Sequence, residues 1–349
     1  MNIRSEYKVA FDGGWSPEQV RDALCAAKSI VLVAHQHADG DAVGSLTGMY
    51  ALLGQVSQAK LTMMLPDGCP DELSWLPNTS HILNAQTDIE ACRLAIGEAD
   101  LVVVLDLGTL ERTGVLADAF AASAAPRLLV DHHLGPDREA FATVVSEPDL
   151  SSTCELVYWL MDSAFGSGIF GRDAATSLFT GICTDTGTFS YSNDRQSVYL
   201  AAASLLQYGI DPMDITRRVK NVFTTNRLRF FGHAMADLLQ VYDHRQVALM
   251  AVTAADMESH GVGSEDVSGL INEVMRLRDV DCAVLVREEQ GPHGPLVRLS
   301  LRSKTIYDVS AIARELFGGG GHERAAGATS RLTLKETVAI VKQRFKLDE

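Results

Sequence analysis

Three short apolar runs constrain the fold of this 349-residue chain more than any other feature. Each run is followed directly by a histidine or an aspartate. They cover residues 29–34, 101–105 and 127–130, and their interiors hold only Val, Leu, Ile and Ala. Strands that are buried on both faces of a parallel sheet have this composition. Stretches rich in Ala and Leu at 46–53 and 89–97 favour helices between the runs, and this alternation predicts an α/β domain with a doubly wound, mostly parallel sheet.

Polar residues stand at the end of each predicted strand. His35 follows the first strand, Asp106 follows the second, and the triplet Asp131-His132-His133 follows the third. A later stretch with helical character ends at Asp185. Because ligands of open α/β sheets bind beyond the carboxyl ends of the strands, we expect these side chains to line one cleft.

The second half of the chain predicts a smaller C-terminal α/β domain. Alternating strands are expected at 246–252, 281–287 and 295–303, followed by a helix from Asp308 and a terminal helix. Residues 210–240 are charged and mixed, without an apolar strand, and we interpret them as a helical linker. The expected division is a first α/β domain, a helical linker and a second, smaller α/β domain, at residues 1–209, 210–240 and 241–349.

Composition excludes several classes of protein. Hydrophobic residues make up 46% and charged residues 21% of the chain, which excludes disordered, collagen-like and low-complexity proteins. No apolar run approaches the roughly 20 residues of a membrane helix, and residues 1–15 lack the pattern of a signal peptide. Only 34 residues precede His35, so we expect no membrane-bound or sensory domain, no membrane partner and a cytoplasmic location. The six cysteines form no C-x-x-C pair and are interpreted as reduced core residues.

The net charge of −15 is unevenly distributed. Residues 1–216 hold 11 Lys and Arg against 28 Asp and Glu, whereas residues 217–349 hold 19 against 17. This acidity disfavours long duplexes as partners. Divalent metals bound in the acidic half would restore positive charge there, so a nucleotide or short oligonucleotide is not excluded.

The densest group of metal-binding residue types is in residues 35–45. His35, Asp39 and Asp41 stand within seven residues after a predicted strand, and divalent ions prefer such ligands. A calcium loop of the D-x-[DN]-x-[DN]-G type fails here, because Val43 and Tyr50 would occupy ligand positions. A turn with a helix cap is the simpler alternative for the segment by itself.

The other strand ends favour the metal site over the turn. Asp106, residues 131–133 and Asp185 are expected at the same cleft, where so many carboxylates would repel one another without a cation. Two ions are indicated, since the number of ligands exceeds what one ion needs.

These residues resemble the DHH phosphoesterase superfamily, whose motifs H-x-x-x-D-G-D-A-x-G-S, a lone Asp, D-H-H and D-T-G all occur here in order. The C-terminal half is similar to the DHH-associated domain through residues 298–303 and 318–327. The resemblance covers residues 20 to 345, and within the superfamily the chain is similar to the nanoRNase and 3′,5′-bisphosphonucleotide (pAp) phosphatase type.

The resemblance implies a centre of two divalent metal ions, usually manganese in this family. One ion would be held by His35 and Asp39 and the other by Asp41, His132 and Asp185, with Asp106 as the bridging ligand. Asp131 would orient His132, and His133 would face the substrate phosphate; a buried packing histidine is the alternative for His133. A hydroxide between the two ions would attack phosphorus in line, so that His133, Asp106 and Asp131 are the candidate catalytic residues.

The second domain is expected to bind the rest of the substrate. The period of two along 295–303 places Arg298, Ser300 and Arg302 on one face, where they bind phosphate or form a solvated surface. The run Gly318–Gly321 lets backbone N–H groups approach an anion or serves as a hinge. The resemblance favours Arg302 and His322, with Gly320 and Gly321, as the groups that bind a terminal phosphate or nucleotide.

The implied activity is that of a phosphodiesterase that shortens oligonucleotides of a few residues, with phosphatase activity on pAp. Its substrates would be short single-stranded RNA and dinucleotides such as pGpG, and relatives are often homodimers. The alternatives are a phosphoesterase for another small nucleotide, such as a cyclic dinucleotide, and a nucleotide sensor without hydrolytic activity.

Overall fold

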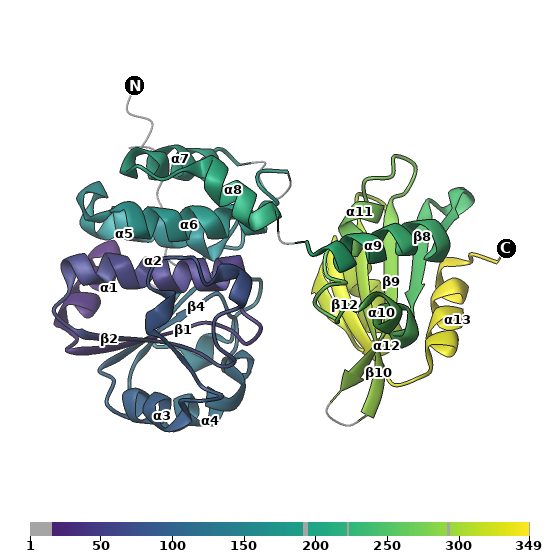
Figure 1. Cartoon of the computed structure of the whole chain (residues 1–349). Helices are drawn as coiled ribbons and strands as arrows, with labels where there is room; N and C mark the ends of the chain where they lie inside the picture. Colours follow the sequence, from purple (N-terminus) through teal and green to yellow (C-terminus); the bar gives the residue numbers. More distant parts are fainter. Residues whose placement is uncertain (1–15, 191–194, 222, 292–293, 349) are drawn as a thin grey trace. The chain divides into compact units, whose positions relative to one another are not determined.

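The computed structural model describes residues 16–190, 195–221, 223–291 and 294–348. The chain divides between residues 222 and 223 into two compact units, and each is described by itself (Figure 1). The division falls inside the range 210–240. The described residues of this range are mostly helical up to Leu239, where strand β7 (Leu239–Tyr242) begins. Helix α8 (Pro212–Lys220) packs against α6 (Arg172–Asp185) in the first unit, whereas α9 (Thr225–His233) packs against α10 (Ala254–His260) in the second. The domain limits at 209 and 241 stay predictions, and residues 1–15, for which we expected no signal peptide, lie outside the described residues.

The first unit contains a fully parallel six-stranded sheet in the order β3-β2-β1-β4-β5-β6. Its strands are β1 (Ser29–Val33), β2 (Lys60–Leu65), β3 (Ile82–Asn84), β4 (Leu101–Leu105), β5 (Arg127–Asp131) and β6 (Thr143–Ser146). The sequence runs away from β1 in both directions, which is the doubly wound topology. The predicted fold class is therefore confirmed.

Helices cover both faces of this sheet because the central strands are apolar on both sides (Figure 1). Ile30 and Leu32 of β1 pack in one core with α1, α2, α5 and α6, whereas Val31 and Val33 pack in a second core with α3 and α4. The helices are α1 (Pro17–Ala26), α2 (Gly40–Val56), α3 (Ile89–Gly97), α4 (Ala117–Ala122), α5 (Thr153–Phe165), α6 (Arg172–Asp185) and α7 (Gln196–Leu205).

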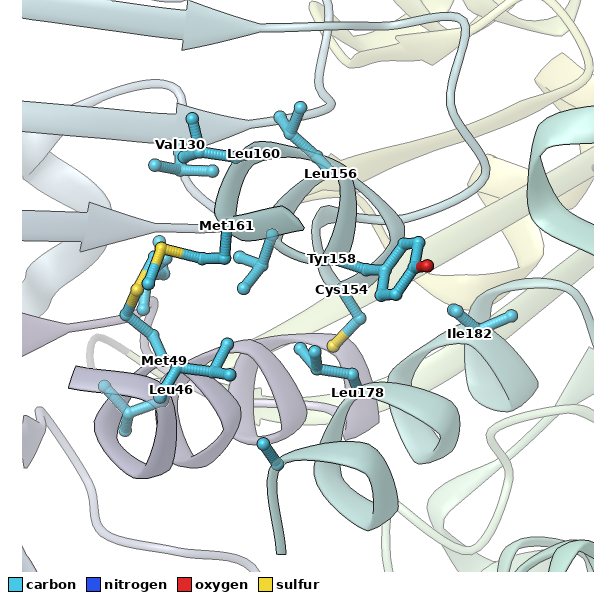
Figure 2. Packing of buried hydrophobic residues seen from close by; sticks show 14 of the residues in the cluster. Leu46, Met49, Val130, Cys154, Leu156, Tyr158, Leu160, Met161, Leu178 and Ile182 are labelled. Carbon is cyan, nitrogen blue, oxygen red and sulfur yellow. The ribbon is translucent and has the colours of Figure 1, made fainter. Parts of the chain in front are cut away.

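Helices α2 and α6 lie in close contact because glycines on α2 face α6. A Cβ atom on Gly44 would lie 2.6 Å from the Ser177 carbonyl oxygen, and one on Gly40 would lie within 3 Å of the Thr184 side chain. Figure 2 shows how α5 packs onto both helices, with Leu46 and Met49 of α2 and Leu178 and Ile182 of α6 around it. This packing brings the first turn of α2 next to the last turn of α6 and the start of α5.

The second unit contains a mixed six-stranded sheet in the order β11-β12-β10-β9-β8-β7. Its strands are β7 (Leu239–Tyr242), β8 (Val247–Val252), β9 (Cys282–Gly291), β10 (Gly294–Ser303), β11 (Gly320–His322) and β12 (Ala325–Ser330). Strands β8 and β9 are parallel and the other neighbours are antiparallel. Its further helices are α10 (Ala254–His260), α11 (Leu270–Val274), α12 (Val309–Phe317) and α13 (Leu334–Phe345).

The two faces of this second sheet differ. Leu299 and Leu301 of β10 are buried in the core formed with α12 and α13. On the opposite face, α9, α10 and α11 share a core with β8 and β9. The neighbouring strand β10 places Arg298, Ser300 and Arg302 on that opposite face, where none of the three is buried. The alternation predicted for this strand is confirmed.

Within the described part of the chain, none of the helices combines the length and the apolar character that a membrane span requires.

Candidate metal centre

The candidate centre lies at the carboxyl ends of the two middle strands of the parallel sheet. Strands β1 and β4 are neighbours at the point where the strand order changes direction, and such a point is the usual ligand site of an open α/β sheet. His35 follows β1 and Asp106 follows β4. Asp106 has a φ of +61°, in the left-handed region that few residues other than glycine adopt. Asp106 therefore has an uncommon backbone conformation at the point where β4 ends.

The first cluster consists of His35, Asp39 and Asp106, whose ligand atoms all lie within 4.8 Å of one another. His35 Nε2 lies 3.5 Å from Asp106 Oδ2 and 3.9 Å from Asp39 Oδ1. Asp39 caps the N-terminus of α2, where its Oδ1 accepts hydrogen bonds from the N–H groups of Asp41 and Ala42. The helix cap expected as the simpler alternative is therefore present, and its side chain also belongs to a group that could hold a metal ion.

The second cluster consists of Asp41, His132 and Asp185, again within 4.8 Å. His132 Nε2 lies 3.3 Å from Asp185 Oδ2 and 3.8 Å from Asp41 Oδ2. The same nitrogen lies 3.8 Å from Asp106 Oδ1. The two oxygens of Asp106 thus face different clusters, Oδ2 toward the first and Oδ1 toward the second.

Asp131 interacts with a different histidine from the one we expected. Its Oδ1 lies 2.7 Å from His133 Nδ1, whereas His132 Nδ1 lies 3.4 Å from the carbonyl oxygen of Leu150. The expectation that Asp131 orients His132 is therefore wrong. Strand β5 ends at Asp131 and the chain bends at His133, so strand alternation does not determine which of the two rings Asp131 contacts.

His133 remains close to the centre. Its Nδ1 lies 3.6 Å from Asp106 Oδ1, and Asp106, His132 and His133 form a third group with ligand atoms within 4.8 Å. Its ring is 31% exposed, which does not fit a buried packing histidine. Burial lowers the pKa of His133, but the hydrogen bond to Asp131 and the charges of Asp106 and Asp131 outweigh it, and the pKa is raised.

Three carboxyl groups of the centre have raised pKa values. Burial, and then repulsion from Asp41 and Asp39, raises the pKa of Asp106 well above its usual range. Burial and the charges of Asp41, Asp39 and Asp106 do the same for Asp185. Burial also raises the pKa of Asp41, although His132 opposes the shift. In this site the ionised forms of Asp41, Asp106 and Asp185 are therefore less stable than they would be in water.

The donor set fits divalent cations. It offers carboxylate oxygens and imidazole nitrogens, which are ligands for ions such as Mn²⁺. A bound cation would offset both the burial and the repulsion that raise the three carboxyl pKa values. The six residues for which metal ligation was predicted come together in the structure, and they are His35, Asp39, Asp41, Asp106, His132 and Asp185.

Sequence reasoning missed two residues of this site. Thr153, the first residue of α5, donates from its N–H to Asp41 Oδ2 at 2.7 Å and from its hydroxyl to Asp106 Oδ1 at 2.9 Å. The exposed Arg112 lies with its Nη1 3.5 Å from the Asp106 carbonyl oxygen, and its charge lowers the pKa of His133. Arg112 comes six residues after a strand-ending aspartate, so its place in the loop beyond β4 was the available signal.

In the second unit, Arg302 and His322 occupy one row of the sheet. Arg302 pairs with Ala325, and Ala325 pairs with His322 on the edge strand β11, so the two side chains share a face across two strands. Ser300 and Gly320 form the next row through Gly327. The residues between these polar side chains on β12 are Ala325 and Gly327.

Arg298 lies on the same face of β10, four residues before Arg302. Its Nη1 donates to Thr329 Oγ1 at 2.9 Å, and its Nε lies 3.4 Å from Glu289 Oε2. These contacts hold its guanidinium within the sheet surface. Arg298 therefore differs from Arg302, whose Nη1 donates to the Leu301 carbonyl oxygen.

The glycine run has mainly structural roles. Gly318 ends α12 with a φ of +64°, and a Cβ on Gly319 would lie 2.2 Å from the Gly327 carbonyl oxygen. Gly321 has a φ of +139°, and its Cβ would collide with Ala325 and Ala326. A Cβ on Gly320 would meet open space. Packing therefore does not exclude a side chain at Gly320.

Comparison with known families gives two matches in this chain. Residues 29–182 match the N-terminal domain of the DHH family, and residues 244–347 match the DHHA1 domain. Every residue of the two metal-ligand clusters except Asp185 lies inside the first match.

Three known proteins are similar over most of this chain. A bifunctional oligoribonuclease and PAP phosphatase NrnA of Thermus thermophilus is 30% identical over 89% of this chain and 87% of its own. The protein of the same description from Bacillus subtilis is 24% identical over 86% and 89%. The crystal structure of an exopolyphosphatase-related protein from Bacteroides fragilis superposes with a TM-score of 0.88 at 30% identity, covering 95% of this chain and 97% of that one.

Proposed function

Because the chain belongs to the DHH/DHHA1 family of phosphoesterases, we propose that it is a metal-dependent phosphodiesterase acting on short oligonucleotides. It would release mononucleotides from dinucleotides and from RNA of a few residues, and it would remove the 3′-phosphate of pAp. The observation that carries the proposal is the convergence of Asp41, Asp106 and Asp185 with His35 and His132 at the switch point of the parallel sheet.

The two clusters support a centre for two ions. We assign His35 and Asp39 to one ion and Asp41, His132 and Asp185 to the other, with Asp106 shared. The support is that Oδ2 of Asp106 faces the first cluster and Oδ1 faces the second. Such a pair of ions, manganese by analogy with the family, would activate water and neutralise the charge of the phosphoryl oxygens.

The residues around the centre would act on the substrate. Asp131 fixes the orientation of the His133 ring through the 2.7 Å contact, and we assign to His133 the role of donating a hydrogen bond to a phosphoryl oxygen. Arg112 is a cation whose Nη1 lies 3.5 Å from the Asp106 carbonyl oxygen, and its planar guanidinium suits phosphate. We therefore add Arg112 to the candidate substrate-binding residues.

Arg302 and His322, together with Gly320, are proposed to bind the terminal phosphate or nucleotide. Their common row on one face of the second sheet supports this assignment. Ser300 lies in the adjacent row and is included, whereas the contacts of Arg298 with Glu289 and Thr329 favour a structural role for that residue. The contribution of Gly321 is to let β11 pack closely on β12.

The proposal is tested by incubating the protein with Mn²⁺ and a 5′-phosphorylated RNA dinucleotide and measuring mononucleotide release. Parallel reactions contain pGpG, pAp, a cyclic dinucleotide and a long duplex. We expect release from the dinucleotides and phosphate from pAp, with no product from the duplex. Binding of the dinucleotide without release would identify a sensor, and turnover of the cyclic dinucleotide alone would assign a different substrate.

A further inference from the structure

Glu155 is a fully buried carboxylate for which the proposed mechanism has no use. It lies in the first turn of α5, and its exposed fraction is 0%. Its Oε2 accepts hydrogen bonds from the N–H of Ser151 at 2.9 Å and from the hydroxyl of Ser151 at 2.7 Å. Its Oε1 accepts from Trp159 Nε1 at 3.3 Å. All three donors are neutral, and burying a carboxylate against neutral donors costs stability that an apolar side chain would not.

The carboxylate anchors a segment that touches the candidate metal ligands. We call residues 150–155 the support segment. Inside it, the N–H groups of Thr153 and Cys154 donate to the two oxygens of Asp41 at 2.7 and 2.8 Å. The Thr153 hydroxyl donates to Asp106 at 2.9 Å. Two buried aspartates are therefore oriented by the first turn of the helix that carries Glu155.

The support segment also reaches the histidine of the second cluster. The carbonyl oxygen of Leu150 lies 3.4 Å from His132 Nδ1. This contact fixes the ring so that Nε2 is directed to Asp41, Asp106 and Asp185. Ser151, which donates hydrogen bonds to Glu155, stands between Leu150 and the helix cap Ser152, so a shift of Ser151 would move both of these neighbours.

We propose that Glu155 is a positioning residue for the metal centre. It holds Ser151, and through Ser151 it sets the places of the groups that orient Asp41, Asp106 and His132. The inference rests on the proposed metal-dependent function, because positioning has a meaning only if these residues bind ions. It predicts that replacing the Glu155 carboxyl group weakens metal binding although no ligand is changed.

The test measures Mn²⁺ binding by titration calorimetry on metal-free full-length protein, together with kcat and KM for a dinucleotide. In E155Q we expect the affinity for Mn²⁺ to fall by about tenfold, the lower end of the effect of losing an outer partner of a metal ligand. We expect kcat to fall with it and KM to change little, since Glu155 is buried away from substrate.

Ser177→Ala is the matched control. Ser177 is equally buried, and its hydroxyl accepts a hydrogen bond from Thr47 at 2.8 Å between α2 and α6. Its loss should lower the melting temperature without changing the affinity for Mn²⁺. An equal loss of affinity in S177A and E155Q would overturn the inference, because it would show that any buried polar defect has this effect.

Ser151→Ala approaches the same interaction from the other side. It removes one donor to Glu155 while the backbone N–H remains, so it serves if E155Q does not fold. We expect a smaller loss of affinity in the same direction. Unchanged Mn²⁺ affinity in a folded E155Q, or in S151A where E155Q does not fold, would overturn the positioning role. If the wild-type protein binds no Mn²⁺, the proposed function itself fails.

Discussion

Asp131 Oδ1 lies 2.7 Å from His133 Nδ1, and this contact couples the last residue of β5 to the histidine two positions later. Asp131 is completely buried, and its Oδ1 is directed at the imidazole. A buried carboxylate in this position fixes both the orientation of the ring and the nitrogen that carries the proton on its side. This orientation of His133 agrees with the proposed hydrogen bond to substrate, while His132 Nε2 is directed at Asp41 and Asp185.

The first prediction concerns this pair. D131N should lower kcat by about 10–100-fold and leave the affinity for Mn²⁺ nearly unchanged, because it alters the partner of His133 and none of the assigned ligands. The double variant D131N/H133A should have a kcat only slightly below that of H133A alone, because residues that act as a unit do not have additive effects. Steady-state rates of the four proteins give this comparison. A large fall of Mn²⁺ affinity in H133A would instead make His133 a ligand.

The second prediction concerns the shared carboxylate. D106N should reduce turnover by more than about 100-fold, beyond the usual effect of losing an outer partner of a ligand. S45A is the control, because Ser45 is buried in the same helix as Asp41 but its hydroxyl bonds only the Ala42 carbonyl oxygen among the contacts described. Rates are compared at saturating Mn²⁺. Similar activities in the two variants would argue against a bridging role for Asp106.

The third prediction concerns metal removal. After treatment with a chelator, addition of Mn²⁺ should raise the melting temperature, since the cation removes the repulsion among Asp41, Asp106 and Asp185. At a free concentration one hundred times the dissociation constant, the gain in stability is about 2.7 kcal/mol for one site. The increase should be much smaller in D106N. A melting temperature insensitive to Mn²⁺ would contradict the metal centre.

The fourth prediction concerns the second unit. R302A should raise KM for a 5′-phosphorylated dinucleotide by about tenfold or more, the loss of one charge-assisted contact with phosphate. KM for a small generic phosphodiester should change little, because such a substrate has no terminal phosphate. R298A should have a weaker effect, since its guanidinium is held by Glu289 and Thr329. Equal increases for the two kinds of substrate would refute the role of Arg302.

The fifth prediction concerns acid stability. Burial alone would raise the pKa of Asp281, but hydrogen bonds from Thr305, Ser303 and the Ile306 N–H outweigh it and hold the pKa below the usual value. The unfolded chain then binds the proton more tightly than the folded one. The stabilisation is therefore present above the ordinary carboxyl pKa, about 4, and is lost as the pH falls through the folded pKa.

D281N should accordingly lower stability at neutral pH by about 1–3 kcal/mol and reduce the dependence of stability on pH below about 4. Urea unfolding between acidic and neutral pH measures both effects. D279N is the control, because Asp279 is exposed two positions earlier. A D281N protein as stable as D279N at neutral pH would show that these hydrogen bonds contribute nothing.

The central strands were predictable because short runs of branched apolar residues are typical of strands that are buried on both faces of a sheet. Strands β2, β3 and β6 were not predicted. β2 begins with exposed Lys60 and alternates irregularly, and β3 and β6 have three and four residues. Such short strands carry no recognisable period, and their pairing with β1, β2 and β5 is what makes them strands.

The amino-acid sequence by itself determined the residue types at the strand ends, and hence a cleft rich in carboxylates and imidazoles, since strand direction brings these ends to one edge. Only the tertiary structure decided which group each one contacts. The contact of Asp131 with His133 instead of His132, and the contact of Thr153 with Asp106, which lies 47 residues earlier in the chain, depend on how the helices and strands pack together. Such contacts join residues that are distant in sequence, and the spacing of residues along the chain does not indicate which of them come close in space.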